Sequence, residues 1–236
     1  MPSYVQKMAY PSALVGYWPL NSKHGARDVS GYGNDAVQHD TGLAEGPGGE
    51  VGGSFYFKGI FGSRLDIPNN GALQTGPYMT MLAWIYPEGN RGPIFSYQRN
   101  FPQTLWDYGA SLWIDSNPSM LATQFWGQDG YKIKSLWNEV IKQGEWQFVS
   151  ATYSLTTGLV KVYWNGTEVA SEDQGSLDLA SQTHFPVVMA GKPAAKDGKK
   201  DERNYKGRIA HMQVYNIALT QEQIKEAMER TKGGYD

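Results

Sequence analysis

The chain has 236 residues, with 21 basic and 23 acidic side chains that give a formal net charge of −2, and it contains no cysteine. A small net charge spread along the chain provides no field that attracts nucleic acid or an anionic membrane, and we expect neither as a partner. Without cysteine there is no disulfide framework and no thiolate metal site, and no run approaches the ~18 consecutive apolar residues of a membrane span.

The composition favours many short strands. Aromatic residues make up 13% of the chain, and 28 glycines and 12 prolines separate the apolar stretches. Short apolar or alternating runs between turn residues are typical of an all-β protein. In chain order, we expect strands at residues 14–18, 35–37, 54–57, 64–67, 78–86, 92–97, 111–114, 120–126, 131–134, 146–153, 159–164, 167–171, 186–190 and 205–214.

Two of these stretches carry the clearest strand patterns. Residues 81–86 are nearly all apolar, as in a strand buried on both faces, and residues 146–153 alternate between apolar and polar side chains. We therefore expect Trp84 and Trp146 to belong to the core. The pair Asn165-Gly166 stands between two strand patterns and predicts a hairpin with a type I′ turn, in which both central residues need positive φ.

A single short helix is expected at the end of the chain. Thr220 and Gln223 have the spacing of a capping box, in which each side chain accepts from the other residue's backbone N–H. Ile224 and Met228 follow at helical spacing, and the glycines at 233–234 provide a stop. We expect this helix to close one edge or one end of the sandwich.

The chain reads as one domain, residues 1–236. No linker divides it; residues 194–204 are a charge-rich stretch that we expect to be a long polar loop, and residues 1–12 are expected to form an N-terminal arm. The first ten residues lack the apolar run of a signal peptide. Two interpretations stay open, a cytoplasmic protein or a secreted protein whose signal has been removed.

Six motifs occur in the order in which they occur in a known family. They are Y-W-P-L at 17–20, D-V-S-G-Y-G-N-D at 28–35, G-S-F-Y-F-K-G with L-D-I-P at 53–68, M-T-M-L-A-W-I-Y-P at 79–87, G-E-W-Q-F-V-S-A-T-Y at 144–153 and V-K-V-Y-W-N-G at 160–166. Together they resemble the laminin-G-like domains of the concanavalin A-like lectin/glucanase superfamily. The resemblance implies a two-sheet antiparallel β-sandwich of jelly-roll type, an extracellular location, and binding of carbohydrate or protein, mostly without catalysis.

The resemblance also raises the question of a structural calcium ion. Where many relatives carry an acidic residue in the last core strand, this chain has Ala210. Asp28, Asn34 and Asp35 in the glycine-rich turn are the oxygen ligands that remain for such an ion, which prefers six to eight oxygens. The alternative, which we favour, is that these side chains hydrogen-bond to the backbone and shape the turn.

No local motif supports catalysis. The superfamily's glucanases carry alternating carboxylates on one strand, E-x-D-x-E, and this pattern is absent. The histidines at 24, 39, 184 and 211 are dispersed, without a metal-ligand spacing. We expect no catalytic residues and a protein that is not an enzyme.

The stretch between Ile94 and Trp137 combines aromatic side chains with planar polar groups, as a site for a polyhydroxyl ligand requires. We expect Trp106, in a loop, to be exposed and to act as a platform for a sugar ring. The alternative is that Trp113 and Trp126 belong to the core and that Arg99 pairs with Asp107 on the surface. The candidate carbohydrate-binding residues are Arg99, Asn100, Trp106, Asp107, Trp126, Gln128 and Asp129.

The sequence therefore predicts a lectin-like protein or module that recognises a glycan by aromatic stacking and hydrogen bonds to hydroxyl groups. Two alternatives stay open: an adhesion or matrix module that binds protein, and a glycan-cleaving enzyme on the same fold. These alternatives stay open because fold alone does not determine function. The oligomeric state is also left open.

Overall fold

The computed structural model describes residues 13–89, 91–98, 109–115, 117, 119–127, 134–179, 181, 185–192, 200 and 202–233. The predicted N-terminal arm at 1–12 and most of the predicted polar loop at 194–204 lie outside these residues, and the single-domain organisation stays a prediction. Within the described ranges the chain forms fifteen strands and one helix. The predicted all-β fold class is confirmed.

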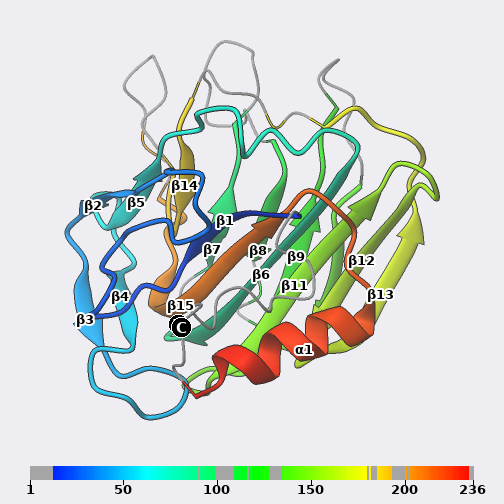
Figure 1. Cartoon of the computed structure of the whole chain (residues 1–236). Coiled ribbons are helices and arrows are strands. Elements are labelled where there is room, and N and C mark those ends of the chain that lie inside the picture. The colour runs from blue at the N-terminus through cyan, green and yellow to red at the C-terminus, as the bar shows by residue number, and fades with distance from the viewer. Residues whose placement is uncertain are drawn as a thin grey trace.

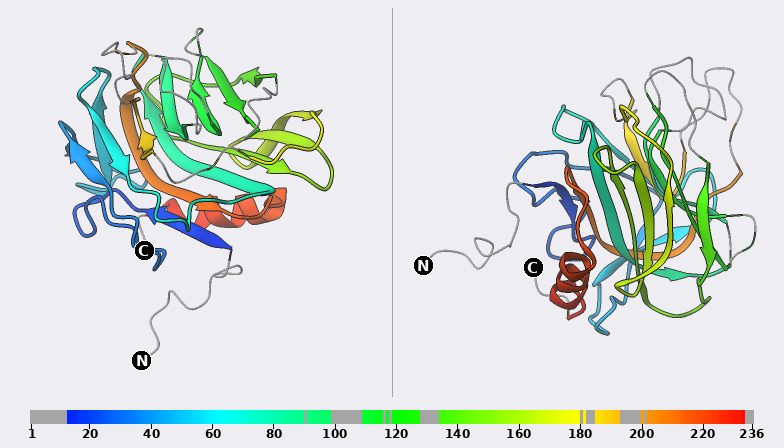
Figure 2. Two further views of the ribbon diagram at one scale, coloured as in Figure 1. Left: turned by 90° about the horizontal axis from the view of Figure 1, so that it is seen from above. Right: turned by 90° about the vertical axis from the view of Figure 1, so that its right-hand side faces the viewer.

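The strands form two antiparallel sheets that face each other as a sandwich (Figures 1 and 2). The first sheet runs in the order β13 (Thr167–Asp173), β12 (Leu159–Trp164), β11 (Gln147–Ser154), β6 (Tyr78–Pro87), β15 (Lys206–Tyr215), β4 (Ser54–Lys58) and β3 (Gly42–Ala44), and β1 (Leu14–Trp18) also pairs with β15. The second runs in the order β10 (Leu136–Glu139), β9 (Met120–Gln124), β8 (Ser111–Ile114), β7 (Gly92–Ser96), β14 (Val187–Met189), β5 (Arg64–Ile67) and β2 (Val37–His39).

Strand β15 joins the two halves of the eight-stranded sheet. One of its edges pairs with β6, while its other edge pairs first with β4, through Lys206 to Ile209, and then with β1, through Met212 to Tyr215. The register shifts between Ala210 and Gln213, where His211 has φ 52°. This bulge separates the part of β15 that pairs with β4 from the part that pairs with β1.

Alternate side chains of β6 belong to two different cores. Met81, Ala83 and Ile85 lie in the core between the sheets, whereas Leu82 and Trp84 belong to a second cluster on the opposite side of the same sheet. A strand covered on both faces needs apolar residues at every position. This confirms the prediction made from the nearly unbroken apolar run at 81–86.

The second cluster lies beneath the helix α1 (Gln221–Thr231), which crosses the outer side of the eight-stranded sheet (Figure 1). The predicted capping box between Thr220 and Gln223 is present. Trp84 is buried, as predicted, but under this helix rather than between the sheets. The prediction that Trp146 is a core residue is wrong: it is half-buried at the margin of the helix-covered cluster, because it precedes β11.

Most predicted strands occur where the sequence placed them, including the hairpin turn, in which Asn165 and Gly166 have φ 48° and 74°. The strands β3 and β10 were not predicted, and β2 begins two residues later than expected. The predicted strand at 131–134 lies outside the described residues except for Lys134, which is not in a strand.

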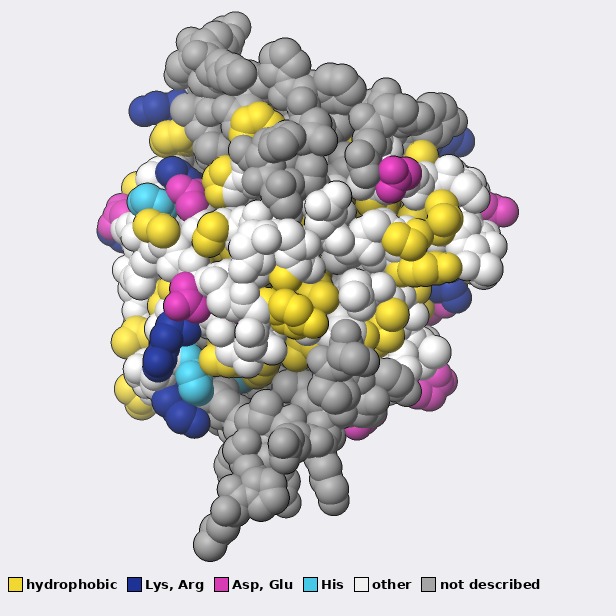
Figure 3. Space-filling model, turned by 45° about the horizontal axis from the view of Figure 1, so that its top comes forward, with side chains coloured by type: hydrophobic (Ala, Val, Ile, Leu, Met, Phe, Trp, Pro, Cys, Tyr) yellow, Lys and Arg dark blue, Asp and Glu magenta, His cyan; other side chains and the backbone are white. Residues whose placement is uncertain are grey.

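The helix that the structure describes is too short and too polar to cross a membrane. On the face shown in Figure 3, acidic and basic side chains are both present, and hydrophobic side chains appear in separate groups between polar ones. This distribution agrees with the mixed charges expected from the sequence.

Candidate functional site

Most of the predicted carbohydrate-binding residues lie outside the described part of the chain. Trp126 is described, and the other six lie outside the described residues: Arg99, Asn100, Trp106, Asp107, Gln128 and Asp129. In sequence, these six belong to the connections that follow β7 and β9. The candidate site can therefore be built from the two strands next to them, β8 and β9, and from their neighbours.

Trp113 and Trp126 lie on the outer face of the seven-stranded sheet. Leu112 and Ile114, on either side of Trp113 in β8, face the core between the sheets, so Trp113 points outward. Trp113 is directly opposite Ala122 of β9, and the two form a separate buried cluster against which Trp126 packs. Trp113 is thus buried, as in the alternative that places it in the core, but in this separate outer cluster, against which Trp126 is partly buried.

A cation covers one of these rings. The guanidinium carbon of Arg203 lies 5.2 Å from the centroid of the Trp113 ring. A guanidinium within ~6 Å of an indole face is attracted by the negative face of the ring. Arg203 comes just before β15, far from Trp113 in the sequence, and the sequence analysis did not identify it.

An exposed tryptophan extends the same face. Trp137 on β10 pairs with Ala122, so the two tryptophans Trp113 and Trp137 lie on either side of this alanine. Their strands are two positions apart, which puts their Cα atoms about 10 Å from each other. Trp137 is 49% exposed, whereas tryptophan is usually highly buried. We call Trp113, Ala122, Trp126, Trp137 and Arg203 the Trp face.

A row of polar residues lies next to the Trp face, two residues further along the strands. Gln124, Ser111 and Ser96 pair across β9, β8 and β7, and the Gln124 side-chain amide donates to the Ser135 hydroxyl. The Ser111 hydroxyl is buried and makes no hydrogen bond to any residue that the structure describes. The half-buried amide of Gln124 next to aromatic rings is suited to contacts with sugar hydroxyl groups, whereas Ser111 and Ser96 are buried.

The far end of this sheet carries a charged cluster. Asp66 of β5 accepts two hydrogen bonds from Arg64, from Nε at 2.8 Å and from Nη2 at 3.0 Å. Nε2 of His39 lies 3.0 Å from an oxygen of the same carboxylate. Bidentate pairing fixes the guanidinium firmly. The outer face of this sheet therefore carries aromatic side chains near its β10 edge and charged side chains near its β2 edge.

The residues considered for calcium shape the glycine-rich turn. Asp28 accepts backbone N–H groups of Tyr17 at 3.0 Å, Ser30 at 2.9 Å and Asn34 at 3.0 Å, and the Asp35 carboxylate accepts the N–H of Asp28 at 2.8 Å. A carboxylate has about four acceptor positions, so these bonds leave Asp28 about one. The contacts fit the turn-shaping role.

The side-chain oxygen of Asn34 is also used, because it accepts the N–H of Asn70 at 3.0 Å. Asp28, Asn34 and Asp35 thus offer few open oxygens to an ion that prefers six to eight. Among the residues that the structure describes, no group of three or more His, Asp or Glu side chains is arranged to hold a metal ion. A structural calcium ion stays a prediction.

Comparisons with known proteins agree with this architecture. Residues 59–225 match the laminin-G family model Laminin_G_3, described as the concanavalin A-like lectin/glucanases superfamily. A segment of 90 residues, 38% of this chain, is 31% identical to Pappalysin-1 of Mus musculus. The chain spans only 5% of that protein's length.

Two solved structures share the fold. The binding domain of Paraclostridial Mosquitocidal Protein 1 has a TM-score of 0.71 at 14% identity, with 92% of this chain and 52% of that chain covered. The Botulinum neurotoxin serotype D ligand binding domain in complex with N-Acetylneuraminic acid has a TM-score of 0.67 at 18% identity, with 94% of this chain and 52% of that chain covered. The chain therefore spans about half of each structure.

Proposed function

This chain belongs to the laminin-G family of the concanavalin A-like lectin/glucanase superfamily, and from that premise we propose that it is a non-catalytic, lectin-like protein or module that binds a glycan at the Trp face. Sugar rings would stack on indole rings, while amide, hydroxyl and guanidinium groups would bond to sugar hydroxyls. Membership of the family also supports an extracellular location as part of this proposal.

The observation that carries the proposal is the exposure of Trp137 beside Trp113. An indole that is 49% exposed leaves much apolar surface in contact with water, and it lies on the same sheet face as a second indole and a guanidinium. The adjacent row supplies the half-buried Gln124 amide, which is hydrogen-bonded to Ser135. Aromatic and polar groups thus converge on one surface.

The six candidate residues outside the described ranges remain part of the proposal. Arg99, Asn100, Trp106 and Asp107 follow β7, and Gln128 and Asp129 follow β9, so their chain segments start from strands at or next to the Trp face. That a solved domain of this fold is in complex with N-Acetylneuraminic acid supports glycan recognition as a use of the fold, without indicating which sugar this chain binds.

A glycan array followed by calorimetry tests the proposal. We expect Trp137→Ala to weaken binding of an array-identified glycan by ~10-fold or more, since ~1.4 kcal/mol of lost stacking corresponds to a factor of ten. Tyr32→Ala is the matched control, because Tyr32 is 44% exposed and lies in the glycine-rich turn rather than on the Trp face. Weaker binding in Tyr32→Ala with unchanged binding in Trp137→Ala would move the site to that turn.

A second candidate function has its own observation. Four exposed aliphatic side chains, Val37, Leu43, Val51 and Ile60, lie on or near β2 and β3, the edge strands at one end of the sandwich. Large exposed apolar side chains on edge strands such as β2 and β3 are suited to contact with a partner protein, which supports an adhesion module. An array without glycan hits would favour this alternative, and release of reducing sugar from a polysaccharide would instead indicate an enzyme.

A further inference from the structure

A row of aromatic and cationic side chains crosses the opposite face of the sandwich, on the outer side of the eight-stranded sheet. Tyr56 of β4 pairs with Arg208 of β15, which pairs with Tyr86 of β6. Trp146 follows on the next strand, with its ring centroid 5.7 Å from that of Tyr86. We call Tyr56, Arg208, Tyr86 and Trp146 the Arg208 row.

The helix α1 does not bury this row. Its last residue, Thr231, bonds to Trp84, which lies two residues before Tyr86 in β6 and on the same face. The four side chains of the Arg208 row are all half-buried, in contrast to Trp84 and Phe148 under the helix. The helix therefore covers the aromatic side chains of Trp84 and Phe148, and it leaves the Arg208 row partly exposed to solvent.

Arg208 is stacked on a tyrosine ring and forms an ion pair with Glu88, but its side chain makes no hydrogen bond to a described residue. Its guanidinium carbon lies 4.5 Å from the centroid of Tyr86, and its Nε is 3.9 Å from the Glu88 carboxylate, beyond hydrogen-bonding distance. A guanidinium carries five N–H donors. No described residue accepts a hydrogen bond from this one. Arg208 is thus held in place by its ring contact and by the ion pair with Glu88, and its N–H groups remain able to donate hydrogen bonds to a ligand.

The charges beside Arg208 are mainly positive. Lys206 lies two residues away on the same face, directly opposite Lys58 of β4, and Lys58 is paired with Asp40. Lys206 makes no ion pair with any residue in the described part of the chain. Glu88 is the nearby acid, and the pKa of Tyr56 is raised by partial burial and by this carboxylate.

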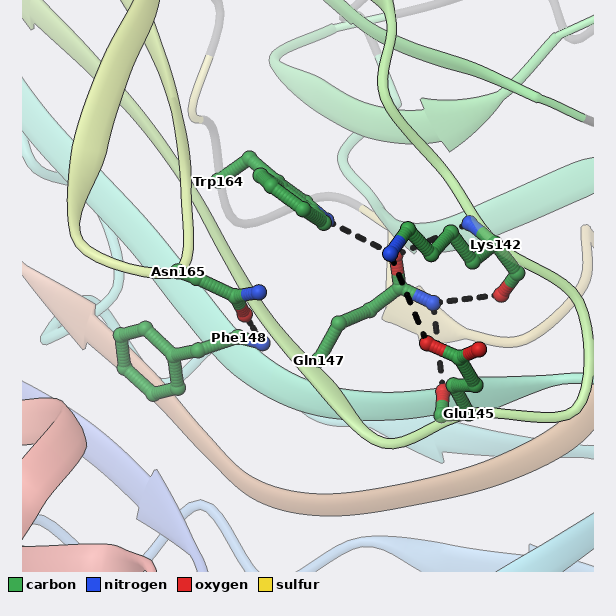
Figure 4. Close-up of polar contacts among 6 residues, drawn as sticks. All are labelled: Lys142, Glu145, Gln147, Phe148, Trp164 and Asn165. Atoms are coloured by element: carbon green, nitrogen blue, oxygen red, sulfur yellow. Dashed lines mark hydrogen bonds and ion pairs between the residues drawn. The ribbon is translucent and has the colours of Figure 1, made fainter.

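A buried glutamine fixes the loop that carries Trp146 (Figure 4). The Gln147 side-chain oxygen accepts the indole N–H of Trp164 at 2.9 Å and the backbone N–H of Lys142 at 3.2 Å. Its amide nitrogen donates to the carbonyls of Lys142 at 2.6 Å and Glu145 at 3.2 Å. Because these bonds hold residues 142–145, Trp146 is presented in one position, which reduces the entropy lost on binding.

We propose that the Arg208 row binds a saccharide that carries a carboxylate group, such as a uronic acid. The carboxylate would accept the paired N–H groups of Arg208, a planar geometry that a guanidinium matches well. The sugar ring would rest against Trp146 and Tyr86, and Lys206 would add attraction for the anion. This site lies on the other side of the sandwich from the Trp face and does not depend on it.

The probe that tests the inference is trigalacturonic acid, with maltotriose as the neutral trisaccharide control. We expect the intact chain to bind trigalacturonic acid, more weakly as salt is raised, and to bind maltotriose at least ~10-fold more weakly. Arg208→Met keeps an apolar stem on Tyr86 but removes the donors, and should weaken binding by ~10-fold or more. Arg230→Met is the matched control, because Arg230 is an exposed helix residue paired with Glu226.

Further variants separate this inference from the proposed function. Trp137→Ala should leave trigalacturonic acid binding unchanged, and Trp146→Ala should weaken it in a variant whose melting curve shows a folded protein. Loss of binding in Trp137→Ala with no change in Arg208→Met would overturn the inference while leaving the Trp face as a glycan site. Equal binding of a hexaglutamate peptide, or no binding of the acidic sugar, would also overturn it.

Discussion

The indole nitrogen of Trp84 donates a hydrogen bond of 2.9 Å to the hydroxyl of Thr231, which in turn donates to the Ala227 carbonyl at 2.9 Å. The last turn of α1 is thereby attached to the middle of the eight-stranded sheet. We expect Thr231→Val, which keeps the shape but leaves the buried indole N–H without an acceptor, to lower the free energy of unfolding by ~1–3 kcal/mol.

Urea unfolding of the two proteins measures this difference. Thr167→Val is the control, since Thr167 is an exposed strand residue, and surface substitutions of this kind usually stay within ~0.5 kcal/mol. An equal effect of the two substitutions would show that the Trp84 bond adds nothing to stability.

The two tryptophans that the sequence predicts to be core residues, Trp84 and Trp146, differ in how deeply they are buried. Trp84→Ala removes a side chain that is 5% exposed and should lower the free energy of unfolding by ~3–5 kcal/mol. Trp146 is only half-buried, so Trp146→Ala should have roughly half that effect. Denaturant unfolding of both variants gives the order, and a larger loss in Trp146→Ala would contradict the burial described above.

Alkaline pH should destabilise the fold through buried tyrosines. Burial raises the pKa of Tyr215 from its ordinary value of 10.0 to about 12, and burial also raises the pKa values of Tyr97 and Tyr205. Because the folded state favours the neutral phenol, this contribution is complete below pH 10.0 and is lost as pH rises toward 12.

Urea unfolding at several alkaline pH values measures the decline, and Tyr215→Phe should make it shallower in that interval. The ultraviolet absorbance of tyrosinate gives a second readout. Titration of every tyrosine near the ordinary pKa, in protein that is still folded, would rule this mechanism out.

The Asp28 carboxylate should be essential to the glycine-rich turn. Asp28→Ala leaves the backbone N–H groups of Tyr17, Ser30 and Asn34 without their acceptor, and each unsatisfied buried group costs about 1–3 kcal/mol. We expect a loss of several kcal/mol, measured by thermal and urea unfolding, with Asp40→Ala at a half-exposed position as the control. A loss below ~1 kcal/mol would mean that water replaces the carboxylate.

Calcium, if it binds this chain, should act on stability rather than on sugar recognition. An ion that binds only the folded state raises the melting temperature by mass action, and we expect glycan affinity to be the same in EDTA as in calcium. Calorimetry under both conditions tests this. Glycan binding that EDTA abolishes and calcium restores would show that the ion contacts the sugar.

Local patterns predicted the strands that have regular side-chain burial. The unbroken apolar run of β6 and the alternation of β11 reflect their packing directly. By contrast, β3 has three residues that are exposed or half-buried, and its pairing with β4 supplies the order that its sequence does not predict. Short edge strands depend on neighbours for their conformation, which is why β3 was missed.

The candidate site was less predictable because its parts meet only in the folded sheet. Trp126 was identified from its own segment, but the contact of Arg203 with Trp113 and the alignment of Trp137 with Ala122 depend on strand register and on a distant segment. The same holds for Arg208 and Tyr86, which pair across β15 and β6. Composition predicted the chemistry of an aromatic and polar site, and topology determined which residues share a face.

The position of β15 has a consequence during synthesis on the ribosome. This strand is made after the other described strands, yet it lies between β4 and β6 and also pairs with β1. Until it emerges, the edges of β4 and β6 that it will cover have no partner, and unpaired strand edges promote association between chains. The eight-stranded sheet therefore stays incomplete until residues 206–215 have been translated, and a premature stop before Lys206 would release a species prone to aggregation.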